Sequence, residues 1–231
     1  MLKVLGVLHR RADLSLDAFR LHWHTVHRGL ALRLGHANIV TGYVQNHRLD
    51  IDVEGLVPFA DGMPELWFED PARFDGMRAS RAYQHGAFHD SDRFMDTARY
   101  QSVVLEAETD VAAPSRRECA GLLKAIFVLD EPLDDARIAD GEPSLTMGDV
   151  APIRLSYHRA YRGSVSARRK PCGGIETSWW PDLDTFRAAW ARRPKSQVEG
   201  ILVEERPIHW PGDPVPPADW SPVVPSSRPQ S

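Results

Sequence analysis

An internal repetition relates the first half of the chain to the second and constrains the fold more than any other feature. Three aromatic positions recur with one offset of 112 residues: Trp67 on Trp179, Phe68 on Trp180 and Phe74 on Phe186. The apolar run 122–129 (LLKAIFVL) also echoes the run 2–9 (LKVLGVLH), each with a lysine near its start. A tandem copy can supply the partner that a one-sided sheet needs to bury its apolar face. The repetition therefore predicts two similar α+β units that pack together as a pseudo-dimer within one chain.

Apolar periodicity in the first half predicts the order β-α-β-β-α-β, which is the ferredoxin-like plan. Strands are expected at 2–9, 38–50, 65–69 and 100–109, with helices at 15–34 and from residue 70 onward, and an irregular or helical segment at 85–96. Strands of the second half are expected at 122–129, 153–161, the start of 176–186, and 200–205. The predicted domains are 1–110 and a degenerate copy at 121–208, joined by a linker at 111–120.

A proline-rich tail is predicted after the second domain, at 209–231. The last 25 residues, 207–231, hold 8 of the 18 prolines of the chain, which excludes a regular helix or a central strand. The tail is either disordered or an extended arm, with Trp210 and Trp220 as its anchors.

The expected first helix carries one buried stripe. Its apolar and aromatic positions are spaced for a single helix face: Leu16, Phe19, Trp23, Leu30 and Leu34. Ser15 is the expected N-cap and Gly35 the expected stop. His27 lies on the same stripe, one turn beyond Trp23. An inward imidazole among aromatic side chains is either a core histidine satisfied by a carbonyl group or a catalytic group in an apolar pocket.

Several motifs together resemble the EthD-domain family. They are F-x3-W-x3-H followed by Gly-Leu, a preceding strand with an Arg-rich turn (KVLGVLHRR), then Gly42-Tyr43, PELWFED and DSDRFMD, in that order over roughly residues 1–107. The family belongs to the ferredoxin-like dimeric α/β-barrel superfamily, whose members include polyketide cyclases, muconolactone isomerases and haem-degrading monooxygenases. The resemblance implies a pocket between the sheet and its helices, small aromatic or polyketide-like substrates, and proton transfer as the common reaction.

His27 is the first candidate for a general base or acid. Tyr43 is expected to orient an oxygen atom or to donate a hydrogen bond to a developing enolate, unless it only packs on the sheet. Either Asp92 or Asp90 would pair with an imidazole and fix its tautomer, with Asp92 the closer match to the family, unless these acids merely cap a helix. His89 is a further candidate partner.

Five side chains are expected to wall the pocket: Phe19, Trp23, Trp67, Phe68 and His85. The sequence leaves open whether Trp67 and Phe68 face the pocket or the interface between the halves, because a shift of one residue exchanges the two faces of a strand. His85 and His89 have the spacing of two metal ligands on one helix face, but Gly86 weakens that helix, and no metal site is predicted. The second half lacks the F-x3-W-x3-H motif, so the functional groups are expected in the first half.

Composition excludes several classes of function. The formal net charge of −4 gives no electrostatic footprint for nucleic acid or anionic membrane. No apolar run approaches the ~20 residues of a membrane-spanning helix. The charged residues Lys3, Arg10 and Arg11 argue against a signal peptide, and two cysteines form no C-x-x-C motif. We therefore expect a cytoplasmic protein with no nucleic-acid or membrane partner.

The sequence and the resemblance together predict a cofactor-independent EthD-type enzyme that needs no cofactor or metal. It would transfer protons by acid/base catalysis, in a dehydration, cyclisation or isomerisation, with a lyase reaction marginally preferred. Its partner would be a small hydrophobic aromatic or polyketide-like carbonyl compound. The chain would be a pseudo-dimer, with a further homodimer left open. The alternatives are a monooxygenase of the same superfamily and a non-catalytic protein that binds a hydrophobic metabolite.

Overall fold

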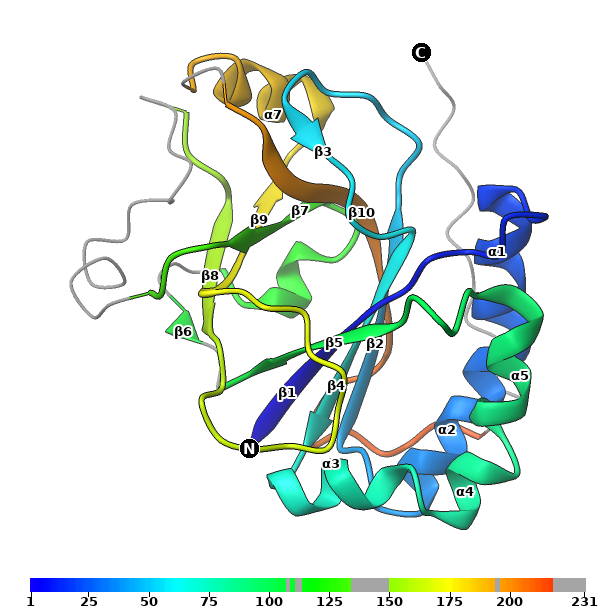
Figure 1. Ribbon diagram of the computed structural model, residues 1–231. Coiled ribbons are helices and arrows are strands. Elements are labelled where there is room, and N and C mark those ends of the chain that lie inside the picture. The colour runs from blue at the N-terminus through cyan, green and yellow to red at the C-terminus, as the bar shows by residue number, and fades with distance from the viewer. Residues whose placement is uncertain (107–108, 111–113, 134–149, 194–195, 218–231) are drawn as a thin grey trace.

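The computed structural model describes residues 1–106, 109–110, 114–133, 150–193 and 196–217. Its strands are β1 (Leu2–Val7), β2 (Gly42–Arg48), β3 (Leu56–Val57), β4 (Gly62–Phe68), β5 (Gln101–Leu105), β6 (Thr109–Asp110), β7 (Leu123–Leu129), β8 (Arg154–Arg159), β9 (Gly174–Trp180) and β10 (Val198–His209) (Figure 1). Its helices are α1 (Leu16–His22), a π-helical turn η1 (Trp23–His27), α2 (Arg28–His36), α3 (Pro71–Met77), α4 (Arg81–Gln84), α5 (Ala87–Phe94), a 3-10 turn η2 (Arg116–Cys119) and α7 (Leu183–Trp190).

The first half forms an antiparallel sheet in the order β5-β1-β4-β2. The four main strands of this half therefore lie in the order fourth, first, third, second, which is the ferredoxin-like arrangement of a β-α-β-β-α-β chain. Helices α1 to α5 all lie on one side of this sheet (Figure 1). The chain is thus a mixed α/β protein with an antiparallel, ferredoxin-like sheet, as the sequence predicts.

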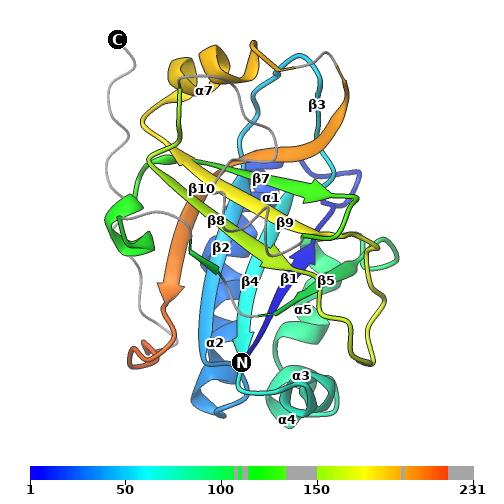
Figure 2. The ribbon, with the colours of Figure 1, turned by 90° about the vertical axis from the view of Figure 1, so that its left-hand side faces the viewer.

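The four main strands of the second half lie in the order β10-β7-β9-β8, which is again fourth, first, third, second. The long strand β10 joins the two sheets: its residues 200–203 pair with β7, and its residues 203–209 pair with β2. At the other side, β5 exchanges backbone hydrogen bonds with the segment that follows β8, including Ser102 N to Arg168 O and Tyr161 N to Val104 O. Figure 2 shows β7, β8 and β9 crossing over β2 and β4.

Side-chain alternation along the strands creates separate cores. On β1, Leu5 and Val7 contribute to a cluster that the first half shares with the second, together with Ile126 and Ile175. Leu2 and Val4 face the other way and pack under the helices with Phe68, Phe74 and Met77. Helix α7 covers the outer face of the second sheet through an aromatic cluster of Phe127, Trp180, Phe186 and Trp190.

The predicted first helix runs from Leu16 to His36 and contains the unexpected π-helical turn. The Ser15 hydroxyl accepts a hydrogen bond from the Ala18 backbone, so the predicted N-cap is confirmed. The predicted stop at Gly35 is wrong, because the helix continues through Gly35 to His36, and the left-handed residue that follows it is Asn38, with φ of 53°. Gly35 is needed for another reason, because a Cβ there would lie 2.9 Å from Val215.

The beginning of the predicted tail lies against the body of the protein. Trp210 contacts Trp67, with ring centroids 6.4 Å apart, and the Arg116 guanidinium lies 5.0 Å from the Trp210 ring. Trp220 and most of the acidic segment 130–144 lie outside the described residues. Within the described part of the chain, every helix is too short or too polar to cross a membrane.

Candidate functional site

The π-helical turn brings two imidazoles onto one carboxylate. His22 Nε2 lies 3.0 Å from Asp90 Oδ1, and His27 Nδ1 lies 2.9 Å from Asp90 Oδ2. In an ordinary α-helix, residues five apart point about 140° away from each other. The wider turn of η1 brings the residues at i and i+5 closer in direction, so both rings reach Asp90 on α5.

Asp90 is 4 % exposed and remains a carboxylate at neutral pH. Burial alone would raise its pKa, but the hydrogen bonds with His27 and His22 outweigh burial and hold the pKa below its usual value. The His27 side chain is 13 % exposed and the His22 side chain 24 % exposed. A buried anion therefore orients two imidazoles that keep contact with solvent or with a ligand.

Strand β2 supplies a buried polar network beside the histidines. The Tyr43 oxygen accepts hydrogen bonds from Trp23 Nε1, at 3.2 Å, and from Gln45 Nε2, at 2.7 Å. The Gln45 oxygen lies 3.0 Å from both His24 Nδ1 and His47 Nε2, which fixes the orientation of the amide. Both donors to Tyr43 point at its oxygen, so its own proton is free to point elsewhere.

The titration of this network follows from its burial. Burial raises the pKa of Tyr43 to about 12, so the group is a neutral hydroxyl at physiological pH. Burial also lowers the pKa of His24 and holds that of His47 well below its ordinary value, which keeps both rings uncharged. The network therefore presents neutral donors and no fixed charge.

A partly enclosed cavity of about 130 Å³ lies between the first sheet and its helices. Most of its walls are apolar side chains from the helices and from β4, and they include Leu34, Leu66, Met77, Ala87, Phe88 and Phe94. His27, Tyr43 and Trp23 line the same cavity, as does Arg78. The predicted pocket between sheet and helices is thus present, and three predicted residues meet in it.

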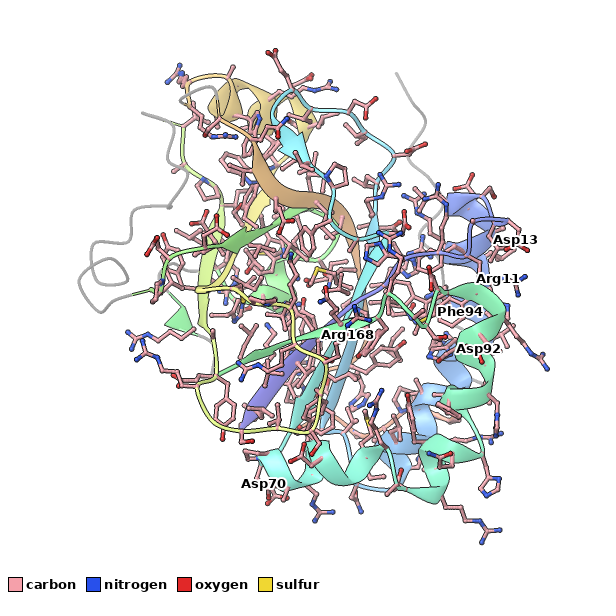
Figure 3. The ribbon with its side chains drawn as sticks, viewed as in Figure 1. Arg11, Asp13, Asp70, Asp92, Phe94 and Arg168 are labelled. Atoms are coloured by element: carbon pink, nitrogen blue, oxygen red, sulfur yellow. The ribbon has the colours of Figure 1, made fainter. Side chains whose placement is uncertain are left out.

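Other predicted residues lie elsewhere. The carboxylate that pairs with His27 is Asp90 and not Asp92, whose side chain is exposed and accepts a hydrogen bond from Thr97. Figure 3 shows Asp92 on α5. The backbone oxygen of Asp92 accepts a hydrogen bond from the Arg11 guanidinium, in the loop before α1. Asp92 is the closer match to the family motif, but it lies two positions, about 200°, around α5 from Asp90 and faces solvent.

His85 and His89 are both exposed and do not line the cavity. The described residues contain no group of three or more His, Cys, Asp or Glu side chains that could hold a metal ion. His85 lies at the C-terminal end of α4 and His89 lies within α5, so they do not share the single helix that their spacing suggests.

The expected wall residues divide between two cores. Phe19 packs behind the cavity against Trp23 and Phe94, with ring centroids 5.7 and 5.6 Å away. Phe68 faces the helices but packs on Phe74 outside the cavity. Trp67 points to the other face of β4, into the space between the halves, where Lys3 lies 5.0 Å from its ring. The alternation along β4 thus settles the question that the sequence left open.

Several residues of the site carry only weak sequence signals. Gln45 and His47 alternate with Tyr43 along β2, which is a detectable pattern once the strand is recognised. On an ideal α-helix, His22 and His27 point about 140° apart. Helical periodicity therefore places on different faces the two residues that the π-helical turn brings to the same carboxylate. Nothing in the local sequence of Arg78 distinguishes it from the other arginines of its segment.

This chain is similar to one protein family over part of its length and, at low sequence identity, to several solved structures. The model of the EthD domain matches residues 11–98. A candidate monooxygenase from Lactobacillus acidophilus NCFM has a TM-score of 0.41 at 8 % identity, over 88 % of this chain and 92 % of that chain. Chlorite dismutase from Candidatus Nitrospira defluvii, in complex with imidazole, has a TM-score of 0.44 at 11 % identity, over 87 % of this chain and 90 % of that chain. A search of curated proteins gave no match.

The region matched by the family model holds most of the cavity wall, which comes from η1, α2 to α5, β2 and β4; Leu8 and Tyr100 line the cavity from outside that region. His27, Tyr43 and Asp90 all lie inside it. Residues 11–98 of this chain therefore match the EthD-domain family.

Proposed function

We propose that the protein is a cofactor-independent enzyme that transfers protons on a small hydrophobic carbonyl compound, with His27 as the general base and acid. The observation that carries this proposal is the contact of His27 Nδ1 with the buried Asp90 carboxylate at the wall of an apolar cavity. A carboxylate on Nδ1 favours the tautomer that carries its proton there, which leaves Nε2 as the basic nitrogen. Asp90 also stabilises the imidazolium that forms when Nε2 takes a proton.

Tyr43 supplies the complementary acid group. Its oxygen already accepts two hydrogen bonds, so its proton is available to the carbonyl oxygen of a bound compound. When His27 removes a proton from the carbon beside that carbonyl, the electron pair moves onto the oxygen and Tyr43 stabilises the enolate. The imidazolium then returns its proton to another carbon, which is isomerisation, or to a departing hydroxyl group, which is dehydration. A lyase reaction of this second kind is our marginal preference.

We also propose that the chain is a tandem pair of ferredoxin-like domains, 1–110 and 121–208, joined by the linker 111–120 and packed as an intramolecular α/β barrel. Two observations support this. The strand order is the same in both halves, and a lysine lies over a tryptophan at equivalent positions: Lys3 over Trp67 at 5.0 Å and Lys124 over Trp179 at 4.9 Å. In this arrangement the second domain completes the barrel, and the first domain carries the site.

Proton transfer can be tested by NMR in D2O with a panel of phenolic β-dicarbonyl and hydroxy-carbonyl compounds. We expect wild-type protein to incorporate deuterium beside the carbonyl or to release water. His27→Ala should abolish this activity, and Asp90→Asn should lower it by about 10²-fold or more because the imidazole loses its orienting carboxylate. His36→Ala, at the exposed end of α2, is the matched control and should leave the rate unchanged.

Three outcomes would contradict the proposal. An unchanged rate in His27→Ala would remove this residue from the reaction. Binding of intact ligand without turnover by wild-type protein would favour a carrier, and ligand-dependent oxygen consumption would favour a monooxygenase.

A further inference from the structure

We propose that the cavity beside His27 takes a single-ring carboxylic acid and that Arg78 binds its carboxylate. This inference names the ligand class of the proposed site. It rests on the proposed function only in stating which carbon of the ligand reacts. It is carried by the size of the cavity, by the apolar character of its walls, and by one cation that lines it.

The size of the cavity limits the ligand to one ring. Its volume is about 130 Å³, and an apolar cavity of roughly 150 Å³ is enough to hold one benzene molecule. Fused polycyclic compounds would need to displace packed side chains such as Phe94, which is fully buried against Phe19. Displacing core side chains is costly because they are close-packed. The cavity therefore fits a monocyclic ring, with any substituents at its opening.

The walls favour an apolar ring, but they contain one cation. Arg78 follows the last residue of α3 and lines the cavity together with Met77, Tyr83 and Tyr100, and its side chain is exposed at the cavity opening. No carboxylate of the described residues lies within ion-pair distance of its guanidinium group. Asp90, the buried acid that contacts His27 of the cavity wall, is already hydrogen-bonded to His22 and His27. Arg78 shares a hydrogen bond with the Tyr83 side chain. Because it has no carboxylate partner among the described residues, its charge is left to meet an anionic ligand.

Two tyrosines, Tyr83 and Tyr100, line the cavity together with Arg78. Burial raises the pKa of both Tyr83 and Tyr100, and in each case the Arg78 guanidinium opposes the rise. Its charge therefore lies close to two hydroxyl groups that also line the cavity. An arginine with neutral hydroxyl neighbours is a suitable carboxylate site, because guanidinium and carboxylate groups form paired charge-assisted hydrogen bonds.

The polar groups of the cavity come from different elements and would contact different parts of a ligand. Arg78 comes from the α3–α4 region, whereas His27 and Tyr43 come from η1 and β2. A ring acid bound to Arg78 would keep its ring among Leu66, Met77 and Phe94. It would then present a ring carbonyl to Tyr43 and the adjacent carbon to His27. A neutral ring of the same shape would lack the contact that fixes this orientation.

Binding can be tested by calorimetry with three probes: benzoate, its neutral isostere benzamide, and the two-ring acid 2-naphthoate. Wild-type protein should bind benzoate at least about tenfold more tightly than benzamide, since a bond to a charged group exceeds a neutral one by that amount or more. It should bind 2-naphthoate more weakly than benzoate. Arg78→Gln should remove the preference for benzoate and leave benzamide binding unchanged. Arg81→Gln, an exposed arginine outside the cavity, is the matched control and should retain the preference.

Three results would overturn the inference: equal affinities for benzoate and benzamide, an unchanged preference in Arg78→Gln, or no binding of benzoate to wild-type protein. Deuterium exchange of 4-oxocyclohexanecarboxylate and its amide separates this inference from the proposed function. Selective benzoate binding without exchange of either compound would retain the ligand class and refute proton transfer. Equal exchange of acid and amide, unaltered in Arg78→Gln, would retain proton transfer and refute the ligand class.

Discussion

At the scale of single residues, the hydrogen-bond directions around Tyr43 matter most. Its oxygen accepts from Trp23 and Gln45, and Gln45 is held in turn by the uncharged rings of His24 and His47. Each member of this network is buried, so none can reorient toward water without losing a bond. The Tyr43 proton is therefore directed by four side chains, of which only Trp23 lines the cavity.

Tyr43→Phe should lower the deuterium exchange rate by about 10²-fold, because it removes one donor to the developing enolate oxygen. It should also lower the free energy of unfolding by about 1–3 kcal/mol, because two buried N–H groups lose their acceptor. Exchange kinetics and urea denaturation check these two effects. Tyr161→Phe, in the second half, is the control. An exchange rate equal to that of wild-type protein would show that Tyr43 only packs.

The pH dependence of the same residue has a defined sign. Its pKa is raised to about 12, so the hydroxyl keeps its proton through the neutral and mildly alkaline range. Its donor function is present below that pKa and is lost only as the pH rises through it. The activity profile should therefore show no alkaline loss due to Tyr43 below about pH 10.

The sequence predicts His27, Tyr43 and Trp23, all of which line the cavity, because each belongs to a local pattern, a helix stripe or a strand. It chose Asp92 over Asp90 because a motif match carries no information about which side of a short helix faces the cavity. The orientation of α5 depends on contacts with α1 and η1 that lie more than 60 residues away in sequence, such as His27 with Asp90. The sequence does not place Arg78 at the cavity for the same reason.

At the scale of elements, the contact between η1 and the start of β4 determines the position of the site. A Cβ on Gly62 would lie 2.4 Å from Trp23 Cζ3, so the strand and the indole ring touch directly. Trp23 is fully buried and also contacts His47, with ring centroids 4.5 Å apart. This close approach holds the π-helical turn, and with it His27, against the sheet.

Gly62→Ala should therefore lower the free energy of unfolding by about 1–3 kcal/mol, the range for overpacking a close-packed core. It should also displace Trp23, which tryptophan fluorescence would report. Gly76→Ala is the matched substitution, since a Cβ at this position of α3 has no atom within 4 Å. It should raise the free energy of unfolding by about 0.5–1 kcal/mol through helix propensity. Equal effects of the two substitutions in urea denaturation would contradict this account.

The sequence predicted the helix that contains η1 but not the π-helical turn itself. Hydrophobic periodicity tolerates one widened turn, because the residues on either side keep nearly the same face. The turn changes which polar residues share a direction, as it does for His22 and His27. The π-helical turn can therefore be recognised only once both ends of the helix have been placed against the sheet.

At the scale of the whole molecule, a buried cluster of charges joins the two halves. Glu65 on β4 forms an ion pair with Lys3 of the first half, at 2.7 Å. It also forms ion pairs with two residues that follow residue 110, Lys124 and Arg116, each at 2.6 Å. Glu205 on β10 contacts Lys124 and Arg116 as well. Burial alone would raise the pKa of Glu65, but Arg116, Lys124 and Lys3 together hold it well below its usual value.

Glu65→Gln should lower the free energy of unfolding by about 3–5 kcal/mol, because it leaves buried cations without their shared anion. Because the folded-state pKa is depressed, the stabilisation from Glu65 is present above its unfolded-state pKa and is lost as the pH falls through the folded value. Wild-type protein should thus lose stability below about pH 4.5, and the variant should lose less. Urea denaturation between pH 7 and pH 3 measures both effects. Glu69→Gln, an exposed acid paired with Arg73, is the control and should change stability by less than about 0.5 kcal/mol.

The repetition in the sequence predicted that the two halves would resemble each other, and their strand orders do match. It could not predict that β10 would pair with strands of both halves, since the pattern of apolar residues along a strand does not name its neighbours. It also gave no reason to place Arg116, from the expected linker, in a buried ion cluster.

The shared strand has a consequence for how such a chain can be divided. A fragment that ends near residue 110 would keep β5, β1, β4 and β2 but would expose the edge of β2 that β10 covers along residues 203–209. It would also keep Glu65 while losing two of the three cations that neutralise it. Such a fragment contains every side chain that lines the cavity. Its sheet would nevertheless have an unpaired, aggregation-prone edge, and the Glu65 carboxylate would be only partly neutralised. The fragment of the second half contains both β10 and the two missing cations, so the two separate fragments should bind each other.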